Sequence, residues 1–383
     1  MTSFLVIGWT GLLTLLGAAG ALAWWLFQSP LTEAIPAPVQ SARVLGQKSI
    51  LLAAAALCIL GAASGGIWDT AWHMRFGVPV QDFWWPPHIT IYLFTFLDAT
   101  VAGLALGRVL RQPGSIRARF RSEPFFGALS LFTATQLGFA PLDEVWHRIY
   151  GKELSGLSLP HLLIVFLQIP CLLLIAAAVR ELQPKSRVAT WLRLPLLFAM
   201  AAGLWALYGV CAGDWEFMLA QGRVPAIHPL WSRPAWSYLL LGLVPAAFFL
   251  GALTSVRGQR WTATTTAVIV NLWGYGLHLL LALAGNPLPF WVTPLGFVLG
   301  GLCMDLWRQR RGDAGAGVAF TVGHLAFMLP ATLLWSRFVT LGPIDLAVVI
   351  VGGVLGGWLA SSAGVRLGAW LTTASSNRLS QAV

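Results

Sequence analysis

The sequence predicts an all-α fold, a polytopic membrane helical bundle of about 11 transmembrane helices that includes two-helix repeats. Only 10% of the 383 residues are charged, whereas soluble globular proteins carry about 25%. Hydrophobic residues make up 57% of the chain, and a disordered protein needs low hydrophobicity. The apolar residues are gathered into runs of bilayer-spanning length. These observations exclude a soluble globular protein and a disordered one.

The apolar runs follow one another with short connections, so the sequence leaves no room for a separate soluble domain. The runs lie at about 4–27, 49–67, 88–110, 124–142, 160–180, 191–212, 235–256, 262–284, 290–306, 317–336 and 343–362. We divide the chain into a first helix with its cytoplasmic loop (1–48), ligand-bearing repeats (49–180), a degenerate third repeat (181–256) and C-terminal helices of unknown role (257–383).

The 24 Lys and Arg residues alternate from loop to loop. Six of them, Arg75, Arg148, Lys152, Arg223, Arg233 and Arg337, lie in one set of loops, and the other 18 lie in the alternate loops and the C-terminal tail. Because basic loops stay in the cytoplasm, the N-terminus is predicted outside and the C-terminus inside a bacterial-type inner (plasma) membrane. The net charge of +10 then reflects topology, and we expect no nucleic-acid partner. Since no basic residue precedes Arg43, no cleavable signal peptide is expected.

Three loops on the predicted outer side share one pattern. In each, an Asp is followed by an aromatic residue at +3, by His or Met at +4 and by Gly at +8. The Asp residues are Asp69, Asp143 and Asp214, spaced 74 and 71 residues apart, the +4 residues are His73, His147 and Met218, and a later histidine follows as His88, His161 or His228. The repeating unit is therefore two membrane helices with one outer loop.

This pattern predicts metal ligands. Residues four apart lie on one face of a helix, so an Asp and its +4 His point the same way. The Gly at +8 allows the helix to stop, and a Pro places the later His in the first turn of the next helix. One carboxylate and two imidazoles form a suitable ligand set for copper, zinc or iron. Asp69, His73 and His88 would hold one ion, and Asp143, His147 and His161 a second. A duplication relic that binds no metal is the alternative.

Further residues are weaker candidates. The third loop is degenerate, although Met218 suits a soft copper ion, and Asp214 and His228 are accessory candidates with it. Glu144 is either a neighbour of the second ligand set or a solvated loop residue. Asp98 lies about ten residues into its span, where an ionisable group is either a proton relay or a protonated or threonine-paired interior residue. The four cysteines lie singly in apolar runs and predict buried core positions.

The first loop resembles a known family. Asp69-Thr70-Ala71-Trp72-His73-Met74, followed by Pro86-Pro87-His88, is similar to the C subunit of particulate methane and ammonia monooxygenases, which belong to the copper membrane monooxygenase family. The resemblance covers roughly residues 50–180. It implies that Asp69, His73 and His88 match the first copper site of the family. Asp143, His147 and His161 would match the second, where the family has an Asn in place of the Asp.

Three functions follow as hypotheses. The first is a copper-binding membrane protein that, if catalytic, hydroxylates a small apolar substrate with O2; its electrons would come from a redox partner or quinol. Other membrane subunits or a homo-oligomer are the further partners of this hypothesis. The second is a transporter of a metal or small solute. The third is a zinc-dependent hydrolase of membrane lipids that activates water with the same ligands. Catalytic residues are not assigned in any of the three.

Overall fold

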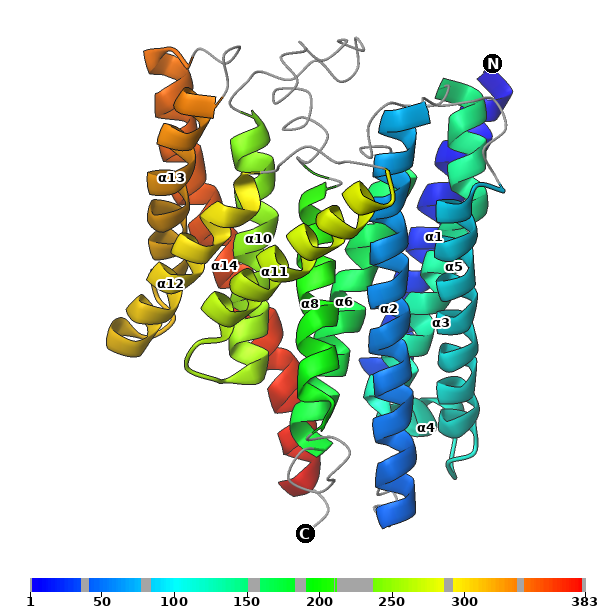
Figure 1. Cartoon of the computed structure of the whole chain (residues 1–383). Coiled ribbons are helices and arrows are strands. Elements are labelled where there is room, and N and C mark those ends of the chain that lie inside the picture. The colour runs from blue at the N-terminus through cyan, green and yellow to red at the C-terminus, as the bar shows by residue number, and fades with distance from the viewer. Residues whose placement is uncertain are drawn as a thin grey trace. The chain divides into compact units, whose positions relative to one another are not determined.

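The computed structural model describes residues 2–35, 41–76, 84–150, 159–182, 191–209, 211, 237–285, 292–335 and 341–380. These residues form helices and connecting turns and contain no strand, which confirms the all-α class (Figure 1). The helices are α1 (Thr2–Phe27), α2 (Ala42–Phe76), α3 (Pro86–Leu110), α4 (Ile116–Ser122), α5 (Pro124–Tyr150), α6 (Leu159–Leu182), α8 (Arg193–Tyr208), α10 (Ser237–Arg257), α11 (Thr262–Leu283), α12 (Thr293–Arg311), α13 (Ala316–Trp335) and α14 (Pro343–Ser380).

Every predicted apolar run coincides with a helix. Eight of these helices are long and apolar enough to cross a membrane: α1, α2, α3, α6, α10, α11, α13 and α14. The remaining three runs fall on α5, α8 and α12. With 16 residues, α8 is shorter than a bilayer requires, and α12 ends in three arginines. A helical membrane protein is therefore confirmed, while the count of 11 spans stays a prediction.

Large apolar side chains on several of these helices point away from the protein. Phe96 of α3 is 69% exposed, Leu334 of α13 is 87% exposed, and Ile344 of α14 is 80% exposed. Exposed apolar surface of this extent is unfavourable in water and favourable in lipid hydrocarbon. The exposed faces therefore indicate contact with a lipid bilayer.

The helices group into two compact units, which we describe separately. Unit 1 comprises Met1–Gly66, Val78–Ala199 and Ser375–Val383, and unit 2 comprises Ile67–Gly77 and Met200–Ala374. The boundary falls inside three continuous helices, α2, α8 and α14, and the last residues of α14, from Ser375, are assigned to unit 1. The last turns of α2 are assigned to unit 2, and the first turns of α8 to unit 1.

In unit 1, α5 packs against α1, α3 and α6, and the short α4 lies where α3 ends and α5 begins (Figure 1). The helix α4 was not among the predicted elements. Arg117 donates to the carbonyl oxygen of Pro30 at 2.8 Å, and Arg121 donates to that of Leu26 at 2.9 Å. Burial, and then the neighbouring Arg117, lower the pKa of Arg121. These arginines satisfy carbonyl groups that the end of α1 leaves open, so they stabilise the fold besides marking topology.

At the same end of unit 1, three helical segments are tied by a buried ion cluster. The carboxylate of Glu123, between α4 and α5, is 2.8 Å from the ammonium of Lys48 in α2 and 3.5 Å from the guanidinium of Arg108 in α3. The Glu123 side chain is only 4% exposed. Because removing one partner of a buried ion pair leaves an uncompensated charge, this cluster fixes how α2, α3 and α5 meet.

In unit 2, α12 packs against α11 and α13, and α10 packs against the same two helices. The core is aromatic. The Trp205 indole of α8 is fully buried, and it makes edge-on contacts with Tyr208, Trp273, Tyr275 and His278 at centroid distances of 6.2, 6.2, 6.1 and 5.4 Å. Edge-to-face packing is favourable for aromatic rings, so Trp205 joins α8 to α11.

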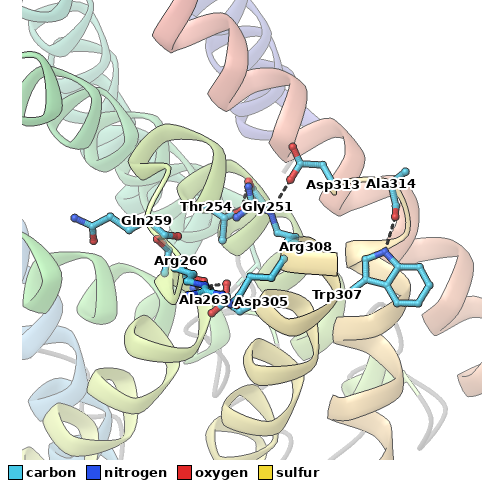
Figure 2. A network of polar contacts seen from close by, with 12 residues as sticks. Gly251, Thr254, Gln259, Arg260, Ala263, Asp305, Trp307, Arg308, Asp313 and Ala314 are labelled. Atoms are coloured by element: carbon cyan, nitrogen blue, oxygen red, sulfur yellow. Dashed lines mark hydrogen bonds and ion pairs between the residues drawn. The ribbon is translucent and has the colours of Figure 1, made fainter. Parts of the chain in front are cut away.

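A second buried carboxylate, Asp305 of α12, caps the start of α11 (Figure 2). Its Oδ2 accepts hydrogen bonds from the backbone N–H of Thr264 at 2.8 Å and from the Thr264 hydroxyl at 2.7 Å. The residue before α11, Trp261, offers no side-chain cap of its own. Asp305 therefore supplies from a neighbouring helix the acceptor that an N-cap residue normally provides.

Candidate functional site

Four helices of unit 1 bring one polar side chain each into the interior of the bundle. They are Cys58 of α2, Asp98 of α3, Thr133 of α5 and Cys171 of α6, which we call the interior quartet. All four are buried; Asp98 is 9% exposed and the other three less. Such groups are costly within a membrane and mark functional candidates.

The contacts of the quartet centre on Asp98. The Thr133 hydroxyl donates to Asp98 Oδ2 at 3.3 Å. The other carboxyl oxygen, Oδ1, is buried and has no hydrogen-bond partner among the described residues. The Cys171 thiol interacts with both Asp98 and Thr133, and the Cys58 thiol lies within electrostatic reach of Asp98. The expected pairing of Asp98 with a threonine is thereby confirmed.

Glycines explain how α2 comes close enough to contribute. Gly61 lies against the ring of Phe94 in α3, and a methyl group built on Gly65 would lie 2.9 Å from the Ile91 side chain. Any side chain at these two positions would push α3 away. Small residues four apart allow helices in membranes to approach closely, and here they bring Cys58, one turn before Gly61, toward Asp98.

The quartet also contains residue types that occur in metal-ligand sets. Among the residues that the structure describes with their side chains, no group of three or more His, Cys, Asp or Glu could hold a metal ion. Cys58, Asp98 and Cys171 all belong to that described set. Hydrogen bonding and proton exchange are chemistry that the observed contact of Thr133 with Asp98 supports.

The first predicted ligand set lies at the predicted outer ends of α2 and α3. As expected, α2 continues through Asp69 and His73 and ends at Phe76, just before Gly77. His88 sits in the first turn of α3 after Pro86, with its ring 6.0 Å from that of Tyr92. The His73 side chain lies outside the described residues, and Asp69 belongs to unit 2 while His88 belongs to unit 1. Their coordination of one metal ion therefore stays a prediction.

The second predicted ligand set lies wholly in unit 1. Asp143 and His147 occupy the last turns of α5, which ends at Tyr150 immediately before Gly151. His161 occupies the first turn of α6, after Pro160. Because residues 151–158 lie outside the part of the chain that the structure describes, the predicted helix stop at Gly151 and the predicted start at Pro160 stay predictions. The side chains of Asp143, Glu144, His147 and His161 lie outside the described residues, so their coordination of a metal stays a prediction.

The third loop cannot be compared in the same way. Asp214, Met218 and His228 all lie outside the residues that the structure describes. Their accessory role also stays a prediction.

Sequence reasoning found Asp98 but missed most of its neighbours. Cys58, Cys171 and Cys211 are buried as predicted, and Cys303 is only partly buried. The grouping of two of these cysteines around Asp98 needed the helix pairing, which no single span reveals. One signal in the sequence could have found them. Thr133 precedes Asp143 by ten residues and Cys171 follows His161 by ten, so a shared site at Asp143 and His161 would also pair Thr133 with Cys171.

A scan against protein-family models, a search of curated proteins and a search of solved structures each found no match for this chain. The resemblance to the monooxygenase C subunit therefore depends on the sequence motifs alone.

Proposed function

We propose that this integral membrane protein binds metal, with copper as the principal candidate and zinc or iron as alternatives, in the manner of the particulate monooxygenases. The second ligand set, Asp143, His147 and His161, carries the proposal. The single observation in its support is the pairing of α5 with α6, which carries these residues at the same end of one helical pair.

The contact between Thr133 and Cys171 shows which residues of α5 and α6 lie at the same height in the bundle. Thr133 of α5 meets Cys171 of α6. The two helices run in opposite directions along the chain. Ten residues onward along α5 lies Asp143, and ten residues back along α6 lies His161. Ten residues are about 15 Å of helix on each side, so the two positions fall at the same level of the bundle.

The third helix of this neighbourhood agrees with that level. Thr133 also meets Asp98 of α3, and His88 lies ten residues back from Asp98 along α3. The level that holds Asp143 and His161 on α5 and α6 therefore holds His88 on α3. His147 lies one further turn along α5. Asp143 and His161 at this level, with His147 one turn further, form a donor set that suits copper, zinc or iron.

The donor set also fits the proposed chemistry. Bound copper would supply O2 activation for hydroxylation of a small apolar substrate, with electrons from a redox partner or quinol. The protein's own contribution is to hold the ligands and to admit the substrate from lipid, and the exposed apolar faces of α3 would contact such a substrate. The first set, Asp69, His73 and His88, would hold a second ion.

Metal analysis of the purified full-length protein tests the proposal. Protein produced with added copper, zinc and iron is measured by mass spectrometry for metal per chain, in the unsubstituted form and as His147→Ala and His161→Ala. We expect bound metal that each substitution lowers. The matched control is His278→Gln, which alters a buried histidine of unit 2 and should keep the metal. A protein without metal above background, or variants that keep all of it, would contradict the proposal.

Transport of a metal or small solute is the second candidate, and the interior quartet favours it. A transporter needs polar groups within the membrane below its outer site, and Asp98 with Thr133 supplies them. Uptake of copper, zinc or protons into vesicles containing the protein distinguishes the candidates. Asp98→Asn should abolish such uptake if the protein is a transporter, and vesicles without any uptake would exclude this candidate.

A further inference from the structure

We propose that Asp98 is a proton-binding site in the interior of unit 1, and that its proton exchanges with the predicted outer side along α5 and α6. The ligand is the proton itself, which converts the carboxylate to a neutral carboxylic acid. The inference goes beyond metal binding and does not depend on it. It depends on burial, on an unpartnered oxygen and on the groups that surround Asp98.

Among the residues that the structure describes, none that interacts with Asp98 supplies a positive charge to balance a carboxylate. The group facing it from α2 is the Cys58 thiol, from α5 the Thr133 hydroxyl and from α6 the Cys171 thiol. The arginines of α4, which also packs on α3, contact the far end of that helix. Arg119 donates to the Leu110 carbonyl, twelve residues, or about 18 Å of helix, from Asp98.

A buried carboxylate without a cation is strongly disfavoured, and the usual outcome is that the group takes up a proton. A neutral carboxylic acid has one O–H to donate and retains acceptor capacity. The protonated Asp98 still accepts the hydrogen bond that the Thr133 hydroxyl donates at 3.3 Å. Its buried Oδ1 then carries no full negative charge. The geometry therefore fits the protonated form and not the ionised one.

Buried polar side chains whose hydrogen-bonding groups are not engaged by the backbone contacts described below continue from the quartet toward the predicted outer end. Gln136 lies one turn beyond Thr133 on α5, and Gln168 lies one turn before Cys171 on α6; both are buried. Counted from the Thr133–Cys171 contact, three residues along each helix, the two glutamines share one level. In the opposite direction, the Ser130 hydroxyl is engaged with the backbone oxygens of Ala102 and Phe126. The glutamines are thus the candidate route for the proton.

Infrared spectroscopy of the full chain in lipid nanodiscs tests both parts. At neutral pH exposed carboxyl groups are ionised, so a carboxylic acid C=O band reports a buried protonated group. We expect such a band in the unsubstituted protein, its loss in Asp98→Asn and in Asp98→Ser, and its downshift as D2O exchanges the proton. A spectrum without a band that these variants remove would overturn the proton site. Should neither variant fold, peptide mapping of carbodiimide labelling at Asp98 in the unsubstituted protein decides the same point.

The exchange rate tests the route. Gln136→Leu and Gln168→Leu remove hydrogen-bonding groups between Asp98 and the predicted outer side. Each should slow D2O exchange of the Asp98 band by about tenfold, the effect of losing one hydrogen bond. Thr135→Val is the matched control, because Thr135 is equally buried on α5 but donates to the Leu131 carbonyl of its own helix; its rate should not change. Equal rates in all three variants would overturn the route.

Discussion

Asp98 and Glu123 are both buried carboxyl groups of unit 1, and their surroundings differ completely. Glu123 has two cations, Lys48 at 2.8 Å and Arg108 at 3.5 Å, at the end of the bundle where α4 lies. Asp98 has one hydroxyl at 3.3 Å, and its other oxygen has no hydrogen-bond partner among the residues that the structure describes. The difference teaches that burial alone does not give a carboxyl group its role. Glu123 is a structural anion that joins helices, whereas Asp98 is suited to gain and lose a proton.

The largest expected effect is that of Glu123→Gln. The neutral amide would leave Lys48 and Arg108 buried without a counter-charge, so the free energy of unfolding should fall by about 3–5 kcal/mol. Unfolding of the detergent-solubilised protein by sodium dodecyl sulfate, followed by tryptophan fluorescence, measures it. The control is Asp313→Asn, which breaks the exposed ion pair with Arg308 and should cost about 1 kcal/mol or less. Equal losses of unfolding free energy in the two variants would contradict the claim that Glu123 stabilises the fold as a buried counter-charge.

Gly61→Ala tests the close packing of α2 on α3 near Asp98. The added methyl group would meet the ring of Phe94, separating α2 from α3 and moving Cys58 away from Asp98. Overpacking of this kind costs about 1–3 kcal/mol, measurable in the same unfolding experiment. Gly46→Ala on the same helix is the matched control, because nothing lies within 4 Å of the new methyl group. A Gly61→Ala protein as stable as the Gly46→Ala protein would show that α2 does not pack closely there.

A smaller effect is expected for Asp305→Asn in unit 2. Asp305 resembles Glu123 in being satisfied, but by the N–H groups and the hydroxyl at the start of α11. The amide keeps one oxygen acceptor, so the loss should resemble that of an N-cap, about 0.5–2 kcal/mol. The midpoint of unfolding by sodium dodecyl sulfate gives the value. A loss as large as that of Glu123→Gln would place Asp305 in the same class as the ion cluster.

The smallest expected effect is that of Asp98→Asn on stability. If Asp98 is a neutral acid, an amide of the same shape replaces it without creating or removing charge, and the unfolding free energy should change by no more than one hydrogen bond contributes, about 0.5–1.5 kcal/mol. A loss of several kcal/mol would mean that Asp98 is an ionised group with a stabilising partner. Asp98 would then be a structural anion like Glu123.

Much of this fold could be predicted from the sequence. Apolar runs located eleven helices, and the Pro86-Pro87-His88 run correctly placed the start of α3. The predicted helix ends after Asp69 and Asp143 and the start before His161 border residues outside the described part of the chain, so they stay predictions. The helix α4 escaped prediction because seven residues with three arginines have no apolar period.

Tertiary partners were not predictable in the same way. Lys48, Arg108 and Glu123 lie in separate segments, and each alone reads as a topology signal or a loop charge. The neighbours of Asp98 come from three other helices, so only the pairing of α2, α3, α5 and α6 reveals them.

Carbodiimide labelling of the unsubstituted protein in nanodiscs tests the central contrast most directly. The reagent takes the acid proton on a nitrogen and is attacked at its carbon by the carboxyl oxygen, so it marks protonated carboxyl groups in apolar surroundings. Peptide mapping then reads Asp98, Glu123 and Asp305 in one digest. We predict modification of Asp98 at neutral pH while Glu123 and Asp305 stay unmodified. An unmodified Asp98, or equal modification of all three, would contradict the account.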